Sequence, residues 1–177
     1  MIEHFKNDKL LALKANQGDA ESFGLLFDKY NSKIYRFIYF KVSNKDTAED
    51  LASQCFLKVW EQILAGTKIK TFQAFIYQVA RNLVIDYYRS REREELPLIY
   101  QIDQQDEGLK YDPDKNLDLD QLEKLLFTLN SGVREIIVLR FIEQLSIKEV
   151  AKIVGKSSAN IRVIIHRTLK ELNKHIK

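Results

Sequence analysis

Residues 146–172 read SIKEVAKIVGKSSANIRVIIHRTLKEL and predict two helices joined by a tight turn. Ser146 and Glu149 fit the Ser-x-x-Glu capping box that begins a helix. Gly155 stands where a left-handed residue ends that helix, and Ser157 can cap the next one. This is the layout of a helix-turn-helix, in which the second helix enters the major groove of DNA.

The second helix of this motif has an inward and an outward face. The apolar inward positions recur at helical spacing: Ile161, Ile165, Leu169 and Leu172. The outward positions are the candidate DNA contacts: Ser157, Ser158, Asn160, Arg162, His166 and Arg167. Asn and Arg can read base edges, whereas Ser and the helix N-terminus can hold phosphates. An ordinary helical hairpin has the same layout, but the coincidence of cap, small Ala151, glycine and polar face favours DNA binding.

An acidic segment separates this motif from the first half of the chain. Residues 94–116 hold both prolines and a net charge of −5, whereas residues 1–93 and 117–177 each carry +4. Because proline interrupts helices and sheet ladders alike, we expect residues 94–116 to be a flexible acidic linker between two domains. The basic blocks suggest contact with a polyanion, although many solvated surfaces carry similar charge.

The first block predicts a helical bundle. Apolar stripes of helical period cover residues 23–38, 48–63 and 72–87, after a short helix around residues 10–15. We find no clean alternation of the kind that strands show. The predicted fold is therefore all-α, with an N-terminal helical bundle over 1–93 and a C-terminal helix-turn-helix domain over 117–177.

The third stripe, FQAFIYQVARNLVIDYYRSRER (72–93), has a second face of a different kind. Opposite its apolar positions we expect exposed aromatic, amide and basic side chains: Tyr77, Gln78, Arg81, Tyr88 and Arg89. Exposed rings and guanidinium groups suit stacking on unpaired bases and pairing with phosphates. The alternative is an amphipathic helix with a solvated basic face.

Other classes of function find little support. The three histidines and Cys55 have no partners at metal-ligand spacing, and no catalytic constellation is present. We therefore expect no enzymatic activity, no cofactor and no metal. The N-terminus lacks a signal-peptide pattern, no apolar run approaches a membrane span, and one cysteine cannot form an internal disulfide. We expect a cytoplasmic protein without membrane insertion.

Taken in order, these motifs resemble the bacterial RNA polymerase sigma factors of the extracytoplasmic-function (ECF) type, over about residues 10–172. GDAESFGLLFDKYNSKIYRF (18–37) resembles the opening of the family's first domain, and TAEDLASQCFLKVW (47–60) resembles its polymerase-docking segment. Residues 72–93 resemble the segment that recognises and melts the promoter −10 element. Residues 134–172 resemble the domain that reads the −35 element.

The resemblance implies three groups of site residues. Core polymerase would contact the outer face of the helix that carries the second apolar stripe (residues 48–63). The residues concerned are Asp46, Glu49, Asp50, Ser53 and Gln54. The −10 element would contact the helix of the third stripe (72–93) and the loop AGTKIKT (65–71), where members of the family bind a flipped base in a pocket. The residues concerned are Lys68, Lys70, Phe72, Tyr77, Arg81, Asn82, Asp86, Tyr88 and Arg89. The −35 element would contact the outward helix-turn-helix positions given above. A structural hydrogen-bonding role competes for Asn82 and Asp86, and a merely solvated face competes for the polymerase contact.

The chain departs from the family pattern at several positions. Ala52-Ser53-Gln54 replaces a frequent Thr-Gln-Glu, and Ile164 stands where arginine is common. The resemblance still implies a sigma factor that binds core RNA polymerase and promoter DNA, both duplex and single-stranded, with an anti-sigma factor as a further partner. A helix-turn-helix regulator that acts without being a polymerase subunit is the alternative.

Overall fold

The computed structural model describes residues 8–94 and 117–175, and these residues form helices and no strand. The all-α prediction is therefore confirmed for this part of the chain. The helices are α1 (Asp8–Asn16), α2 (Ala20–Val42), α3 (Lys45–Leu64), α4 (Phe72–Glu94), α5 (Leu117–Thr128), α6 (Ser131–Ile137), the π-helical turn η1 (Val138–Ile142), α7 (Ile147–Val154) and α8 (Ser158–His175). Of the predicted linker, Glu94 closes α4, and residues 95–116 lie outside the described ranges.

The first block, α1 to α4, is held together by local caps and one apolar core. Asp19 begins α2 by accepting hydrogen bonds from the amides of Glu21 and Ser22, and Asn44 begins α3 in the same way. The predicted stripes meet in the bundle, where their central side chains are fully buried: Ile34, Phe37, Ile38, Cys55, Val59, Ile63, Ile76 and Ala80. Cys55 is thus a packed core residue, and burial raises the pKa of its thiol to about 12.

The second block, α5 to α8, begins and ends its helices as predicted. Ser146 and Glu149 form both hydrogen bonds of the capping box at the start of α7. Gly155 adopts the left-handed conformation at the end of α7, with φ +70°. The Oγ of Ser157 accepts from the amide of Asn160 at 3.2 Å, which caps α8. The helix-turn-helix geometry therefore follows from local signals in the sequence.

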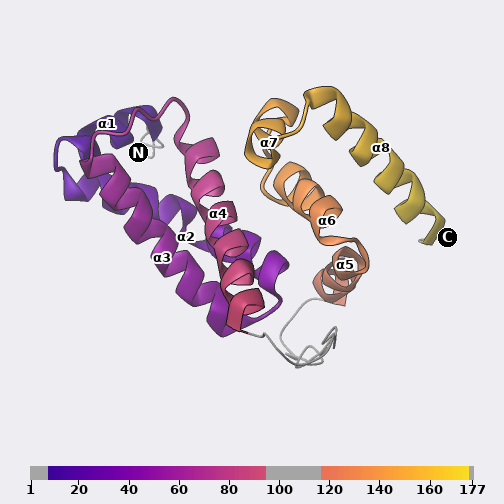
Figure 1. Ribbon diagram of the computed structural model, residues 1–177. Helices are drawn as coiled ribbons and strands as arrows, with labels where there is room; N and C mark the ends of the chain where they lie inside the picture. Colours follow the sequence, from indigo (N-terminus) through magenta and orange to yellow (C-terminus); the bar gives the residue numbers. More distant parts are fainter. Residues whose placement is uncertain (1–7, 95–116, 176–177) are drawn as a thin grey trace.

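The two blocks pack against each other. Helices α6 and α7 and the turn η1 lie against α2 and α4, while α8 lies on the far side of the second block (Figure 1). Buried residues of both blocks belong to one continuous apolar cluster. This arrangement covers part of α4 and leaves the outer face of α8 open.

Two predicted side-chain orientations are wrong. Tyr77, expected on the exposed face of α4, has no exposed surface, because its ring packs against Phe37 of α2 and its hydroxyl is bound by Glu143 of the second block. Leu169, expected to face inward on α8, is 40% exposed, whereas Thr168 is buried and donates a hydrogen bond to the carbonyl of Ile164 at 2.9 Å.

Candidate nucleic-acid surfaces

The outward face of α8 presents its polar side chains to solvent. Asn160, Arg162, His166 and Arg167 are all exposed, and Ser157 is exposed at the cap. Ser158 is half-buried at the first turn. The helix is anchored by Ile161, which is fully buried, and by half-buried Ile164 and Ile165 packed on the core. The predicted −35 residues therefore share one accessible face at the N-terminal end of a firmly seated helix.

The N-terminal half of α4 is covered. Phe72 packs on the Tyr30 ring at a centroid distance of 5.3 Å and is buried. The Tyr77 hydroxyl donates to Oε2 of Glu143 at 2.7 Å, and its ring meets Phe37 edge-on. Burial and the adjacent carboxylate raise the pKa of Tyr77 far above its usual value. In this arrangement neither ring is available for stacking on a base.

Arg81, in the middle of α4, is engaged by the second block. Its Nε lies 2.9 Å from Oε1 of Glu135, and Nζ of Lys41 lies 3.2 Å from Oε2 of the same carboxylate. The Glu135 side chain is only 4% exposed, so the ion pairs are shielded from solvent on the glutamate side. The guanidinium expected to contact phosphate contacts a carboxylate instead.

The C-terminal half of α4 is open. Asn82, Asp86, Tyr88 and Arg89 are all exposed. Asp86 and Arg89 approach to 4.0 Å, and the Tyr88 hydroxyl donates to the Lys41 carbonyl at 2.9 Å. The exposure of Asn82 and Asp86 favours a surface role over a structural one. The predicted −10 residues thus fall into a covered group and an open group.

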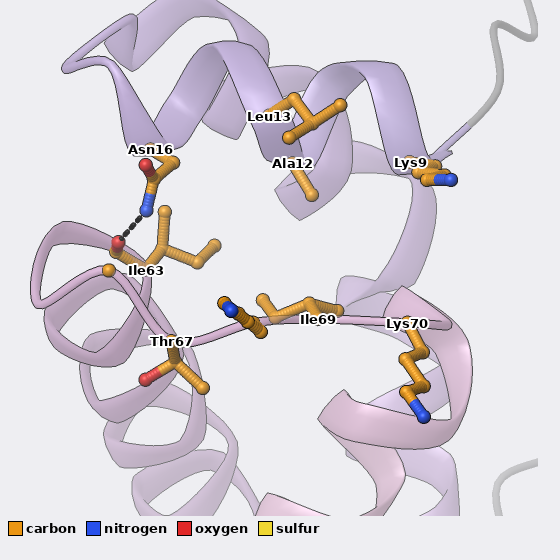
Figure 2. Close-up of a pocket in the computed structure, with 10 residues that line it drawn as sticks. Lys9, Ala12, Leu13, Asn16, Ile63, Thr67, Ile69 and Lys70 are labelled. Carbon is orange, nitrogen blue, oxygen red and sulfur yellow. Dashed lines mark hydrogen bonds between the residues drawn. The ribbon is translucent and has the colours of Figure 1, made fainter.

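A cavity of about 310 Å³ lies between α1 and the loop 65–71 (Figure 2). Its walls combine apolar side chains with lysines: Lys9, Ala12, Leu13, Asn16, Ile63, Gly66, Thr67, Lys68, Ile69 and Lys70. The end of α3, just before the loop, is held against α1 by the side-chain amide of Asn16, which donates to the Ile63 carbonyl at 2.6 Å. The sequence indicated the loop and its lysines, whereas the α1 wall was missed. The available signal in the sequence was Leu13, an apolar residue within the short predicted helix around residues 10–15.

The outer face of α3 gathers the predicted polymerase contacts. Asp46, Glu49, Asp50, Ser53 and Gln54 are all exposed. Leu57, on the same helix, is 59% exposed and was not singled out from the sequence. Trp60 is half-buried, and its ring packs against the Phe23 ring of α2 at a centroid distance of 4.6 Å. The result is an acidic and polar face with one apolar side chain.

Metal and membrane chemistry find no support in the described part of the chain. No group of three His, Cys, Asp or Glu side chains is placed there to hold a metal ion. No described helix is long and apolar enough to span a membrane.

Comparison with known proteins gives consistent relatives. Residues 26–94 match the family model for Sigma-70 region 2, and residues 119–172 match that for Sigma-70 region 4. The ECF RNA polymerase sigma factor BldN of Streptomyces coelicolor is 33% identical over 169 residues, covering 92% of this chain and 63% of BldN. The chain thus spans less than two thirds of that relative.

One further relative and one solved structure match over most of their length. The ECF RNA polymerase sigma factor SigX of Bacillus subtilis is 27% identical over 164 residues, covering 89% of this chain and 84% of SigX. The solved structure of CnrH in complex with the cytosolic domain of CnrY matches with a TM-score of 0.71 at 22% identity, covering 96% of both chains. This structural likeness concerns the fold.

Proposed function

The chain belongs to the RNA polymerase sigma factors of the extracytoplasmic-function type, and we propose that it binds core RNA polymerase and directs it to specific promoters. In this proposal residues 1–93 contact polymerase and the −10 element, and residues 117–177 read the −35 element. The mechanism is binding and strand capture, without covalent catalysis. Its site of action is the cytoplasm, where polymerase and DNA meet.

The observation that carries the proposal is the open face of α8. Five polar residues lie on the exposed surface at the start of a helix whose cap, turn and anchor fit a recognition helix. Arg162 and Asn160 have the donors to read base edges in the major groove. Ser157 and the helix N-terminus suit phosphate contacts that fix the register.

Strand capture is proposed for the cavity between α1 and the loop 65–71. Its apolar walls could receive one extruded base, while Lys68 and Lys70 at the loop neutralise the adjoining phosphates (Figure 2). Extrusion costs a few kcal/mol and stacking returns about 1–3 kcal/mol per base. Because that balance is close, the chain needs polymerase to open promoter DNA.

The α3 face supports the proposed docking on core polymerase. It presents exposed acids in its first half and exposed Leu57 farther along the same helix, and interfaces commonly combine polar and apolar side chains in this way. An anti-sigma factor is proposed as a further partner, because the sigma factor RpoE of Bartonella quintana, whose fold matches with a TM-score of 0.70, was solved in complex with the anti-sigma factor NepR.

Runoff transcription with purified core polymerase tests the proposal, on a template that carries the chain's own upstream region. Addition of the chain should yield promoter-specific transcripts. Arg162→Ala should weaken −35 binding, whereas Lys70→Ala should impair opening and leave duplex binding nearly intact. Lys14→Ala, which removes an exposed lysine away from the cavity, is the matched control. Absence of promoter-specific transcripts would refute the proposal.

The alternative hypothesis is that the chain is a helix-turn-helix regulator that acts without being a polymerase subunit. It predicts tight binding of the chain alone to a palindromic site, with half-sites one helical turn apart. A sigma factor should instead bind promoter DNA weakly on its own, with a steep dependence on salt. A salt titration of duplex binding, with and without core polymerase, separates the two.

A further inference from the structure

We infer that the second block inhibits the first by occupying the Tyr77 and Arg81 part of its −10 surface with two glutamates, Glu135 and Glu143. The inference rests on the proposed function, and it adds a closed state in which duplex reading and the cavity are available but Tyr77 and Arg81 are not, so that an opened strand binds more weakly. The inhibitory element is the surface of α6, η1 and α7 that packs on α2 and α4.

Each glutamate bridges two groups of the first block. Glu143 accepts from Nε of Arg36 at 2.8 Å and from the Tyr77 hydroxyl at 2.7 Å, and its side chain is fully buried. Glu135 accepts from Arg81 at 2.9 Å and lies 3.2 Å from Nζ of Lys41. Two carboxylates thus hold three cations and a tyrosine on one side of the bundle.

These carboxylates resemble phosphates because both present anionic oxygens to cationic side chains. A phosphate of an opened strand would present anionic oxygens to the same guanidinium groups, and a base would need the Tyr77 ring uncovered. A strand therefore cannot use Arg81 and Tyr77 while Glu135 and Glu143 hold them. Helix α8 lies on the far side of the second block from this contact (Figure 1), and Asn160, Arg162, His166 and Arg167 on it are exposed.

The backbone around Glu143 is arranged for this contact. The amide of Glu143 bonds to the Val138 carbonyl at 3.0 Å, which is the i to i+5 pattern of η1. In a regular α-helix, eight residues would leave Glu143 about 80° around the axis from Glu135. The wider π-helical turn holds more residues and reduces that angle, so both glutamates reach the first block. Such turns are rare and recur at functional sites.

The closed contact is suited to reversible opening. The desolvation of a buried ion pair offsets most of its attraction, so an intact pair contributes little net stability, whereas removal of one partner leaves a buried charge unpaired and is strongly destabilising. In the separated state the same glutamates, arginines and lysine regain water. The pairs therefore specify how the blocks dock without locking them together, and a competing polyanion can displace them.

The test measures separation of the blocks and binding of single-stranded DNA in the full chain. Donor and acceptor dyes are placed by Gln17→Cys and Asn173→Cys, both exposed positions, while buried Cys55 is not labelled. The test variant is Glu135→Gln with Glu143→Gln. The control, Asp28→Asn with Glu171→Gln, makes the same change in charge at two exposed residues outside the contact.

The test variant should show lower energy transfer than the control. Its affinity for a single-stranded −10 oligonucleotide should exceed that of the control by about tenfold, the gain expected if the competent fraction rises from roughly a tenth to nearly all. Unchanged transfer, or lower transfer with affinity equal to the control, would overturn the inference.

Arg36→Gln provides a second route to opening if the double variant folds poorly. It replaces one partly exposed cationic side chain of the contact and does not change α4. It should also lower the energy transfer between the two dyes. Failure of the inference is distinguishable from failure of the proposed function. Wild-type holoenzyme that transcribes while opened variants gain no strand affinity would overturn the inference alone. Absence of strand binding by every form, with core polymerase included, would overturn both.

Discussion

Helices α4 and α8 both carry basic and polar side chains suited to nucleic acid, yet these side chains differ in their exposure to solvent. On α8 the exposed candidates lie together on one face that no other described helix covers. On α4 the candidates are divided, with Tyr77 and Arg81 held by the second block and Tyr88 and Arg89 open to solvent. A similar composition therefore gives a ready surface in one helix and a withheld surface in the other.

The difference follows from what each helix packs against. Helix α8 is the last element and rests on α6 and α7 by one side alone, so its opposite side stays free. Helix α4 lies between its own bundle and the second block, so both sides meet protein over the first part of its length. Substitutions on the covered part of α4 should therefore affect folding first, and those on the outer face of α8 should affect DNA binding first.

The largest expected effect is at the anchor of α8. Ile161→Ala removes a fully buried side chain and should lower the free energy of unfolding by about 2–5 kcal/mol, because it leaves a cavity in the core. Val163→Ala, two residues on, removes a side chain that is 47% exposed and should change it by less than about 0.5 kcal/mol. Urea unfolding measures both, and equal losses would show that α8 is not anchored through Ile161.

The next effect is on the covered side of α4. Tyr77→Phe removes the hydroxyl that donates to Glu143 and leaves a buried carboxylate oxygen without that bond, at an expected cost of about 1–3 kcal/mol. Tyr88→Phe removes an exposed hydrogen bond to the Lys41 carbonyl and should cost less. If thermal unfolding ranks Tyr88→Phe as the more damaging change, α4 is not covered as described.

The elements that were predicted correctly depend on neighbours in the sequence. The capping box at Ser146, the left-handed Gly155 and the Ser157 cap are contacts within a few residues, so residue type and spacing are enough to indicate them. The apolar stripes of α2, α3 and α4 are also local patterns. For the same reason the outward face of α8 could be predicted. The exception is Leu169, which was expected to face inward and is exposed, whereas the neighbouring Thr168 is buried.

The parts that were missed depend on residues far apart. Tyr77 and Glu143 are separated by 66 positions, and neither helical period nor charge indicates that they meet. Periodicity assigned Tyr77 to the face opposite the bundle core, but its ring packs edge-on against Phe37 of α2 and its hydroxyl meets Glu143 of the second block. The cavity similarly needs α1 beside a loop some fifty residues later, and the bond from Asn16 to Ile63 spans 47 positions.

A smaller effect is expected at the start of α8. Ser157→Ala removes the side-chain acceptor for the Asn160 amide and should lower the free energy of unfolding by about 1 kcal/mol. Fraying of this first turn would also weaken −35 binding, since the candidate contacts begin there. Ser158→Ala makes the same chemical change one residue later, outside the cap position, and should leave stability nearly unaltered. Denaturant midpoints and duplex affinities of the two variants give the comparison.

The smallest effect on stability is expected at the open end of α4. Arg89→Gln disrupts a 4.0 Å approach to Asp86 between two largely exposed side chains, and exposed ion pairs contribute little. Its unfolding free energy should therefore stay within about 0.5 kcal/mol of wild type. If Arg89 contacts a phosphate, the slope of log affinity against log salt for single-stranded DNA should fall by roughly one contact's share, about 0.7. An unchanged slope would remove Arg89 from the −10 surface, and the phosphate contacts proposed there would then fall to Lys68, Lys70 and Arg81.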